Sequence, residues 1–220
     1  MHRNISLPEQ LTPLINTAEL NIIDLQCIRD DRILFEQLNF TAKSGELIQI
    51  EGHNGSGKTS LLRILCGLTL ATEGQVLWNN TDILDDRANY WTHLNYIGHT
   101  TGVKSELTPL ENLTVARALS AHPTDISLDE ALARVGLYGF EDVPSRTLSA
   151  GQKRRVALAR LLINDAPLWI LDEPFTALDK HAIKMLETLF DAHAQRGGLA
   201  LLTSHHTIKC DYARILKLTD

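Results

Sequence analysis

The N-terminal third of the chain has the apolar pattern of strands followed by a helix. Segments 20–28, 33–41 and 46–51 are short and apolar, as strands are. A helix is predicted to begin near Lys58 and to end around Gly67, because glycine is common just after a helix C-terminus. Its apolar residues recur at helical spacing: Leu61, Leu62 and Leu65. A strand, a glycine-rich loop and a helix therefore follow one another here.

The middle of the chain, from about residue 100 to 165, has the pattern of helices. The segments TPLE at 108–111 and SLDE at 127–130 each place a hydroxyl residue three positions before a glutamate, which is the capping-box pattern. We therefore expect a mostly helical subdomain. The helix that follows SLDE should end at Gly136, and its apolar positions are Leu128, Ala131, Leu132 and Val135.

Strand patterns return in the last quarter of the chain. The apolar segments PLWILDE at 167–173 and LALLTS at 199–204 flank a long helical segment, and RILKL lies near the end of the chain. Short apolar strands that alternate with helices indicate a parallel sheet covered on both faces. The pattern thus predicts an α/β fold.

Length and composition indicate one soluble domain. With 220 residues, of which 44% are hydrophobic and 22% charged, the chain is long enough to bury a core and carry an insertion. We divide it into an N-terminal extension, residues 1–18, and a single domain, residues 19–220. The balance of 21 Lys+Arg against 27 Asp+Glu gives a net charge of −6. This charge argues against a nucleic-acid-binding surface.

Cysteine usage and hydropathy indicate a cytoplasmic protein. Cys27, Cys66 and Cys210 lie far apart and form no C-x-x-C pair, so we expect buried thiols in a reducing compartment, without metal or redox chemistry. No apolar run approaches the ~18 residues that a membrane helix needs. The first residues lack the apolar centre of a secretory signal. Work at a membrane would therefore require other chains to span it.

The segment GHNGSGKT at 52–59 fits the phosphate-binding pattern G-x-x-x-x-G-K-[ST]. In this pattern, loop N–H groups and the helix N-terminus surround the phosphates, the lysine reaches the β- and γ-phosphates, and the hydroxyl binds Mg²⁺. The alternative is a glycine turn that happens to precede Lys-Thr, but the strand before it and the helix after it favour the phosphate loop. The predicted nucleotide-binding residues are Gly52, His53, Asn54, Gly55, Ser56, Gly57, Lys58, Thr59 and Ser60.

Two acidic residues end the apolar strand at 168–173. A phosphate loop needs a second carboxylate source for the metal, normally at the end of a hydrophobic strand. We predict that Asp172 holds Mg²⁺ through its water shell and that Glu173 polarises the attacking water as general base. The alternative, an acidic helix N-cap after a core strand, is less favoured because the phosphate loop is present.

A further helix is predicted from the segment LSAGQKRRVALARLL at 148–162. Ser149 has the position of its N-cap and Gln152 the position N3, so the helix would present N–H groups and a serine hydroxyl at an anion-binding end. About 20 residues separate this anion-binding end from the Asp172 strand, so it cannot easily fold back onto the same phosphate loop. On its own, the segment has the pattern of an ordinary capped helix.

The motifs together resemble the ATP-binding cassette family. GHNGSGKT, LSAGQ, LWILDEP, TALD and TSHH occur in the family's order, and the resemblance runs from about residue 20 to the end. It implies a P-loop NTPase fold with a mainly parallel sheet core, an N-terminal antiparallel β subdomain and a helical subdomain, binding ATP and Mg²⁺. It also implies a head-to-tail homodimer in which signature residues contact the ATP bound by the other copy. Here these residues are Ser149, Ala150, Gly151 and Gln152.

The resemblance assigns two further residues. Asp179, which ends TALD, would lie in the dimer-contacting loop, and His205 would be the switch histidine that senses the γ-phosphate. A histidine pair at 205–206 would otherwise be a loop feature, but its place after the strand LALLTS favours the catalytic role. The expected catalytic residues are thus Lys58, Glu173 and His205.

The sequence departs from the family's pattern at two positions. His99 stands where the family usually has a glutamine near the metal; a neutral histidine can still donate to a metal-bound water. Arg29 stands where an aromatic residue commonly stacks on adenine; a guanidinium plane can also stack on a base. We therefore assign Arg29 and His99 to the nucleotide site and His99 also to the metal site, together with Thr59 and Asp172.

With these two departures, the chain resembles a narrower family, the cytochrome c maturation ATPases. These are cassette subunits of the bacterial haem exporter. CIRDDRILF at 27–35 and YIGHTTGVKSELTPLENL at 96–113 carry this resemblance. It implies a peripheral dimer on the cytoplasmic face of the inner membrane, bound to integral permease subunits. ATP hydrolysis would drive haem handling and release of a haem-loaded periplasmic chaperone. The alternatives are a transporter ATPase for another solute and a soluble cassette ATPase.

Transmission to the membrane partner is expected around residues 99–113. We predict that residues 101–107 line a groove that receives a short cytoplasmic helix of the permease. Val103 and Leu107 are the apolar residues of this segment.

Overall fold

The first sheet of the protein is antiparallel and has the strand order β2-β1-β4-β5. The structure is a computed structural model that describes residues 18–206, 208, 210 and 212–218, so nearly all of the predicted N-terminal extension lies outside the described residues. Two-residue turns join β1 to β2 and β4 to β5, with positive φ at Asp30 and Asp31 and at Asn79 and Asn80, as type I′ hairpins require. The strands are β1 (Glu19–Arg29), β2 (Arg32–Lys43), β4 (Glu73–Trp78) and β5 (Thr81–Asp82).

The second sheet is parallel and has the order β6-β7-β8-β3-β9. It confirms the predicted parallel core, and β3, β7, β8 and β9 lie where the apolar segments predicted strands. Its strands are β3 (Leu47–Glu51), β6 (Leu94–Ile97), β7 (Leu168–Asp172), β8 (Leu199–Thr203) and β9 (Ala213–Lys217).

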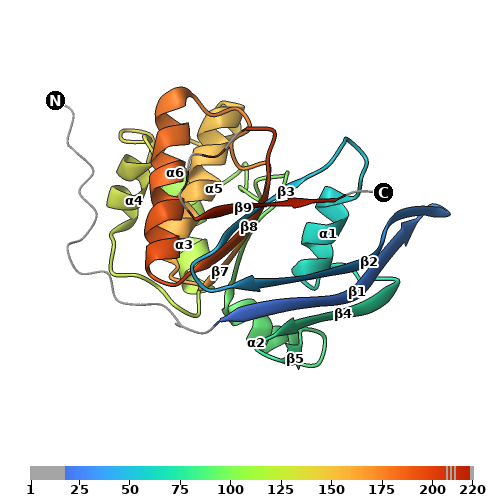
Figure 1. Ribbon diagram of the computed structural model, residues 1–220. Coiled ribbons are helices and arrows are strands. Elements are labelled where there is room, and N and C mark those ends of the chain that lie inside the picture. The colour runs from blue at the N-terminus through green and yellow to red at the C-terminus, as the bar shows by residue number, and fades with distance from the viewer. Residues whose placement is uncertain (1–17, 207, 209, 211, 219–220) are drawn as a thin grey trace.

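Helices cover one face of the parallel sheet, and the antiparallel sheet lies on the other side (Figure 1). Helices α3 to α6 are grouped on one side, with α1 on the opposite side between the two sheets, as the figure shows. The helices are α1 (Lys58–Leu65), α2 (Arg87–Thr92), α3 (Pro109–Ala118), α4 (Leu128–Arg134), the short 3-10 helix η1 (Ser145–Thr147), α5 (Ala150–Ile163) and α6 (Lys180–Gln195).

Alternate residues of one buried strand explain these two layers. In β7, Leu168 and Ile170 pack in the same cluster as α1 and the antiparallel sheet, whereas Trp169 and Leu171 pack with α5 and α6. Because successive side chains of a strand point to opposite faces, an entirely apolar strand must be covered on both. The sheet therefore has a core on each face, and its carboxyl edge is left to carry polar residues.

Most predicted elements are confirmed, and one cap differs. Thr108 and Glu111 form the predicted capping box at α3. At α4, Ser127 accepts from the Glu130 amide, but the Glu130 carboxylate binds Arg134 one turn later at 2.5 Å instead of returning to the cap. The box is therefore half-formed, because a cation at i+4 competes for the carboxylate.

The prediction of three buried cysteines is partly wrong. Cys27 and Cys66 are buried, and burial raises the pKa of both thiols, whereas Cys210 is partly exposed. No helix among residues 18–206, 208, 210 and 212–218 is long and apolar enough to cross a membrane.

Candidate nucleotide-binding site

The phosphate loop joins β3 to α1 and is closed around its own lysine. Gly57 is the N-cap of α1 at φ 91°, and a Cβ there would lie 2.9 Å from Leu34 Cβ, so this position requires glycine. Lys58 Nζ donates to the carbonyls of Gly52 at 2.7 Å and His53 at 2.9 Å. The ammonium group is thus held inside the loop, where a phosphate chain bound to the loop N–H groups would lie.

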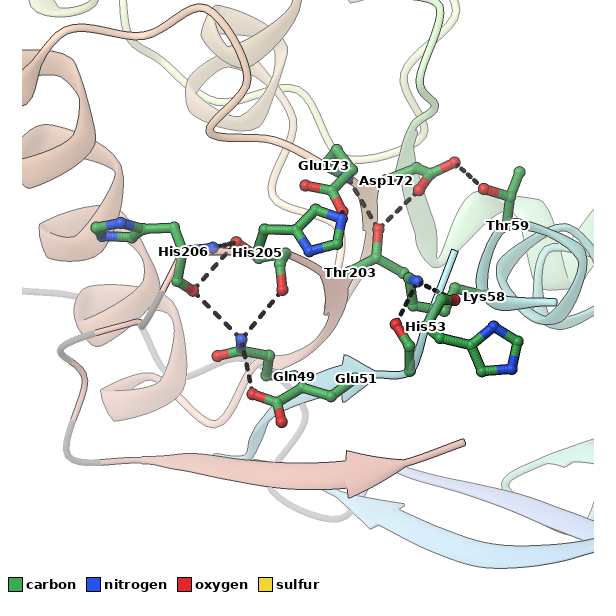
Figure 2. A network of polar contacts seen from close by, with 12 residues as sticks. Gln49, Glu51, His53, Lys58, Thr59, Asp172, Glu173, Thr203, His205 and His206 are labelled. Carbon is green, nitrogen blue, oxygen red and sulfur yellow. Dashed lines mark hydrogen bonds and ion pairs between the residues drawn. The ribbon is translucent and has the colours of Figure 1, made fainter. Parts of the chain in front are cut away.

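The carboxylate of Asp172 links the phosphate loop to the parallel sheet (Figure 2). Its Oδ2 accepts from Thr59 Oγ1 at 2.9 Å, and its Oδ1 accepts from Thr203 Oγ1 at 2.7 Å. Thr203 is fully buried at the end of β8 and also accepts from the Glu173 amide at 3.0 Å. Three adjacent elements, α1, β7 and β8, therefore fix the two acidic residues.

Glu173 and His205 face each other at the edge of the sheet. His205 Nε2 lies 3.6 Å from Glu173 Oε1, with the histidine side chain largely exposed and the glutamate side chain mostly buried. Glu173 has a φ of 49°, a conformation that is uncommon for a residue other than glycine. Strain of this kind persists where surrounding structure holds it, and the Thr203 bond does so here.

A cavity of about 750 Å³ brings most of the predicted nucleotide residues together. Arg29 and His99, the two departures from the family pattern, both line it. Arg29 is held by bonds to the carbonyls of Ile28 at 3.0 Å and Leu70 at 2.9 Å, which fix its guanidinium plane at the hairpin tip. The lining residues are Arg29, Asp30, Arg32, Leu34, Asn54, Gly55, Gly57, Lys58, Thr59, Ser60, His99, Asp172, Glu173, Thr176 and His205.

The residues of this cavity fit a magnesium nucleotide. The buried hydroxyl of Ser56 has no hydrogen-bond partner among the described residues, and it lies within the loop that would surround a phosphate. The Thr59 hydroxyl and the Asp172 carboxylate are oxygen ligands of the kind that Mg²⁺ prefers. The cavity volume also lies within the range of small-molecule sites.

The backbone of His99 is fixed by a buried arginine. Arg154 of α5 donates to the carbonyls of Gly98 and His99, each at 3.0 Å. Burial lowers the pKa of its guanidinium, and the nearby carboxylates of Asp172 and Glu173 partly offset this. The segment after β6 is thereby attached to the helix that begins with the signature residues.

The predicted signature residues lie outside this cavity. Ser149 and Gln152 form the predicted capping box at the start of α5, and Ser149 is exposed. None of the four signature residues is among the residues that line the cavity. The exposed N-terminus of α5 therefore contributes nothing to the cavity of its own chain.

The signature helix and the TALD loop are packed as one unit. A Cβ at Gly151 would lie 2.5 Å from the carbonyl oxygen of Ala177, so only glycine allows this approach. Asp179 caps α6 through Ala182 N at 2.9 Å and pairs with Arg155 of α5 at 2.6 Å. The Ala182 amide and then Arg155 lower the pKa of the Asp179 carboxyl.

A second cavity, of about 500 Å³, lies away from the nucleotide residues, and we call it the apolar groove. Leu68, Trp91 and Leu119 are exposed at its rim. None of residues 101–107 lines the apolar groove, so the groove lies elsewhere than the segment predicted to receive the permease helix. Its lining residues are Cys66, Leu68, Ala88, Trp91, Thr92, Leu94, Asn95, Tyr96, Ala116, Leu119, Ser120, Ala121, Arg160, Ile163 and Asn164.

Sequence reasoning missed three residues that organise the nucleotide site. Thr203 bridges Asp172 and Glu173, Arg154 fixes His99, and Gln49 binds the turn that carries His205. Gln49 has the clearest signal in the sequence, since it is a single amide within the apolar run LIQI of β3. A buried amide in such a strand must find hydrogen-bond partners.

Comparison with known proteins assigns the chain to a family. Residues 35–176 match the ABC transporter family. The chain is 57% identical to the cytochrome c biogenesis ATP-binding export protein CcmA of Methylococcus capsulatus, over 88% of this chain and 94% of that protein. It is 52% identical to CcmA of Aliivibrio fischeri, over 90% and 98%.

Solved structures show the same fold. An ATP-binding subunit of an ABC transporter is 26% identical, with a TM-score of 0.78 over 90% of this chain and 85% of that one. A dimeric bacterial ABC transporter cassette is 24% identical, with a TM-score of 0.77 over 90% and 94%. The chain therefore belongs to the ABC transporter family and, within it, to the family of the cytochrome c biogenesis ATP-binding export proteins.

Proposed function

We propose that the chain is the ATP-hydrolysing subunit of a membrane haem exporter for cytochrome c biogenesis. The observation that carries the catalytic part is the bonded set of Thr59, Asp172, Thr203 and Glu173 beside Lys58. Bound Mg²⁺, held by Thr59 and Asp172, would supply positive charge beside the β- and γ-phosphates. Glu173, the proposed general base, lines the cavity in which most of the predicted nucleotide residues meet.

The reaction is phosphoryl transfer to water. Glu173 takes a proton from water as the water oxygen attacks the γ-phosphorus, the bond from that phosphorus to the bridging oxygen breaks, and ADP leaves. Lys58 neutralises charge on the β- and γ-phosphates, and His205, whose Nε2 lies 3.6 Å from Glu173 Oε1, donates toward the γ-phosphate. Positioning and charge neutralisation supply most of the acceleration.

Two copies assemble head to tail. Ser149, exposed at the N-terminus of α5 and outside its own cavity, binds the γ-phosphate held by the other copy. Mixing a Lys58→Ala chain with a Ser149→Arg chain tests this arrangement, because a mixed dimer contains one site in which both groups are intact. Turnover in the mixture above that of either chain alone supports the head-to-tail arrangement. A mixture no more active than its parts, although pull-down with a different tag on each chain shows mixed dimers, contradicts it.

The membrane partner docks in the apolar groove. Arg160 of α5 lines this groove, and no group among the described residues accepts a hydrogen bond from its guanidinium or pairs with it. Burial lowers its pKa, which marks a cation that lacks a local counter-charge. A short amphipathic helix of the permease with one carboxylate among apolar residues would match both the exposed rim and Arg160. Arg160 also approaches Gly102, since a Cβ there would lie 3.7 Å from its Nη1, close to the segment that carries His99.

The proposed role in haem handling is based on the similar proteins. The names of the similar proteins state cytochrome c biogenesis and export, and the high identity over most of both chains supports the same role here. The chain would then work on the cytoplasmic face of the inner membrane and drive release of a haem-loaded periplasmic chaperone.

Co-purification tests the assignment. The Glu173→Gln chain is tagged, extracted from membranes in mild detergent with ATP, and analysed by mass spectrometry and haem absorbance. Recovery of cytochrome c maturation membrane subunits with haem supports the proposal. Recovery of an unrelated permease without haem supports an ATPase for another solute, with the same catalytic residues.

A further inference from the structure

Gln49 connects the strand of the phosphate loop to the turn that carries His205. The residue is 5% exposed, in the middle of the buried strand β3. Its Nε2 lies 3.3 Å from the Ser204 carbonyl, 3.2 Å from the His206 carbonyl and 3.3 Å from Glu51 Oε1 (Figure 2). All three neighbours are acceptors, so the amide nitrogen, and not the amide oxygen, faces the turn.

The Gln49 side-chain bonds lie just beyond the point where the backbone pairing between β3 and β8 ends. Strand β8 pairs with β3 up to Thr203, opposite Ile50, and then leaves the sheet. The next residues have no strand partner, and the Gln49 side chain holds them on both sides of His205. The Gln49 amide thus keeps residues 204–206 bonded to β3 after the backbone pairing between β3 and β8 has ended.

The turn is also closed on itself and held from its far side. The Ser204 hydroxyl accepts from the His206 amide at 2.8 Å. The His206 ring lies 5.0 Å from the Phe175 ring, and its Nε2 lies 3.5 Å from Glu187 Oε1 of α6. Between these two anchored residues, the His205 side chain is free to project toward Glu173.

We propose that Gln49 is a positioning residue that holds the Ser204–His206 turn so that His205 stands beside Glu173 and the γ-phosphate. Gln49 touches no substrate and acts through His205. Strand β3 ends two residues after Gln49, and the next residue is Gly52, the first of the phosphate loop, whose carbonyl accepts from Lys58. The strand that places the lysine therefore also places the histidine, and the two meet the same phosphate from different sides. This inference rests on the proposed hydrolysis of ATP at this site.

The test is a double-mutant cycle on the full chain with MgATP. Gln49→Met keeps the length and the buried surface but removes both N–H donors. We expect it to lower kcat about tenfold, as expected for a small displacement of a catalytic group, with the KM for ATP changed less than about twofold. Because Gln49 acts through His205, the double variant Gln49→Met/His205→Ala should be no slower than His205→Ala alone. Gln75→Met, on an exposed position of β4, is the matched control.

Three outcomes overturn the inference. They are an unchanged kcat in Gln49→Met, effects that multiply in the double variant, and a rise in KM that accounts for the whole loss. If the wild-type chain binds ATP but does not hydrolyse it, the proposed function is contradicted and the turnover test of Gln49 cannot be made. A structural measurement on the same variants then tests the role of Gln49 separately.

That measurement is hydrogen exchange of the peptide that contains residues 204–206. Gln49→Glu keeps the shape of the side chain but presents oxygens, which cannot donate, to the three acceptors. It is therefore a second test variant if the methionine variant fails to fold. We expect faster exchange at the His206 amide in both variants, with unchanged exchange in the strand β7. Unchanged exchange at 204–206 overturns the inference, whatever the turnover shows.

Discussion

The Thr203 hydroxyl donates to Asp172 Oδ1 at 2.7 Å, from a fully buried position on the neighbouring strand. Because the Thr59 hydroxyl takes the other carboxylate oxygen, the proposed magnesium ligand is held from two sides. Thr203 also accepts from the Glu173 amide at 3.0 Å. One buried hydroxyl therefore aligns the proposed metal ligand and the proposed general base.

Replacing Thr203 with valine should separate these groups without changing the volume of the core. Val lacks the hydroxyl, so Asp172 loses a donor and the Glu173 amide is left without its acceptor, at a cost of about 1–3 kcal/mol for each unsatisfied buried group. We expect about a tenfold lower kcat and a higher Mg²⁺ concentration for half-maximal turnover. Steady-state turnover measured against Mg²⁺ concentration checks this.

The matched control is Thr188→Val. Thr188 is exposed on α6, and its hydroxyl donates only to the Lys184 carbonyl within its own helix. Its variant should turn over ATP as the wild type does. An unaltered Mg²⁺ dependence in Thr203→Val would show that Thr59 and β7 hold Asp172 without the second bond.

Replacing Glu173 with glutamine should trap two copies around ATP. The amide keeps the size of the carboxylate but cannot take a proton from water, so we expect turnover to fall by about a hundredfold or more. ATP then remains bound, and size-exclusion chromatography with light scattering should show a dimer with MgATP and a monomer with ADP. Near-normal turnover would remove Glu173 as the base.

Lys58→Ala in the same Glu173→Gln background controls for dimers that need no nucleotide. Loss of the lysine removes the ammonium group now held by the Gly52 and His53 carbonyls, so phosphate binding should fail and the chain should stay monomeric in MgATP. A dimer that persists in this variant would be unrelated to the proposed ATP-bound state.

Local patterns predicted the elements whose signals are contiguous in the sequence. The strand–loop–helix order of residues 47–65, the Thr108 capping box and the Ser149 capping box each depend on residues within a few positions of one another, and each is present. Elements β4, β5 and α2 received no prediction: β5 and α2 are short, and β4 (EGQVLW) begins with polar residues and glycine, so it lacks the continuous apolar run of β3, β7 and β8. The pair Asn79–Asn80 did carry a usable signal, since two asparagines with positive φ suit a type I′ turn.

The bonds that organise the site could not be predicted in this way. Thr203 and Asp172 are far apart in sequence and meet because β7 and β8 are parallel neighbours. Gln49 meets Ser204 for the same kind of reason, across β3 and β8. A lone threonine or glutamine in a strand gives no indication of its partner, so only the sheet order identifies it.

Buried His193 should make the protein less stable in mild acid. Its ring stacks on Trp169 with centroids 3.7 Å apart, and burial lowers its pKa from 6.5 to about 3. Below about pH 6.5 the unfolded chain binds a proton that the folded chain does not, so stability falls by about 1.4 kcal/mol per pH unit until pH approaches 3. Between pH 7 and pH 5 the expected loss from this group is about 2 kcal/mol.

Urea unfolding at the two pH values measures this loss, and His193→Gln is the comparison. Glutamine does not titrate, so this variant starts from lower stability at pH 7 but should lose about 2 kcal/mol less than the wild type on going to pH 5. Equal losses in the two chains would mean that His193 is protonated in the folded state near pH 5 and that other groups cause the acid sensitivity.

Arg160 should control capture of the membrane partner without controlling ATP turnover. It lies in the apolar groove, on the opposite end of α5 from Ser149, and no partner for its guanidinium lies among the described residues. Arg160→Met keeps the apolar stem and removes the charge, so we expect capture of the permease from membranes to fall about tenfold, as for the loss of one charge-assisted hydrogen bond. Turnover by the isolated chain should remain within about twofold.

The lysine variant separates charge from packing. Arg160→Lys keeps a cation in the groove and should retain most of the capture, whereas Arg146→Met, which removes an exposed cation on η1, should leave capture unchanged. Since a surface charge pair is screened by salt and a half-buried one much less, the difference between the arginine and methionine chains should persist at high ionic strength. Equal capture by all four chains would show that the groove is not where the permease binds, and substitutions at Val103 and Leu107 would then test residues 101–107 in its place.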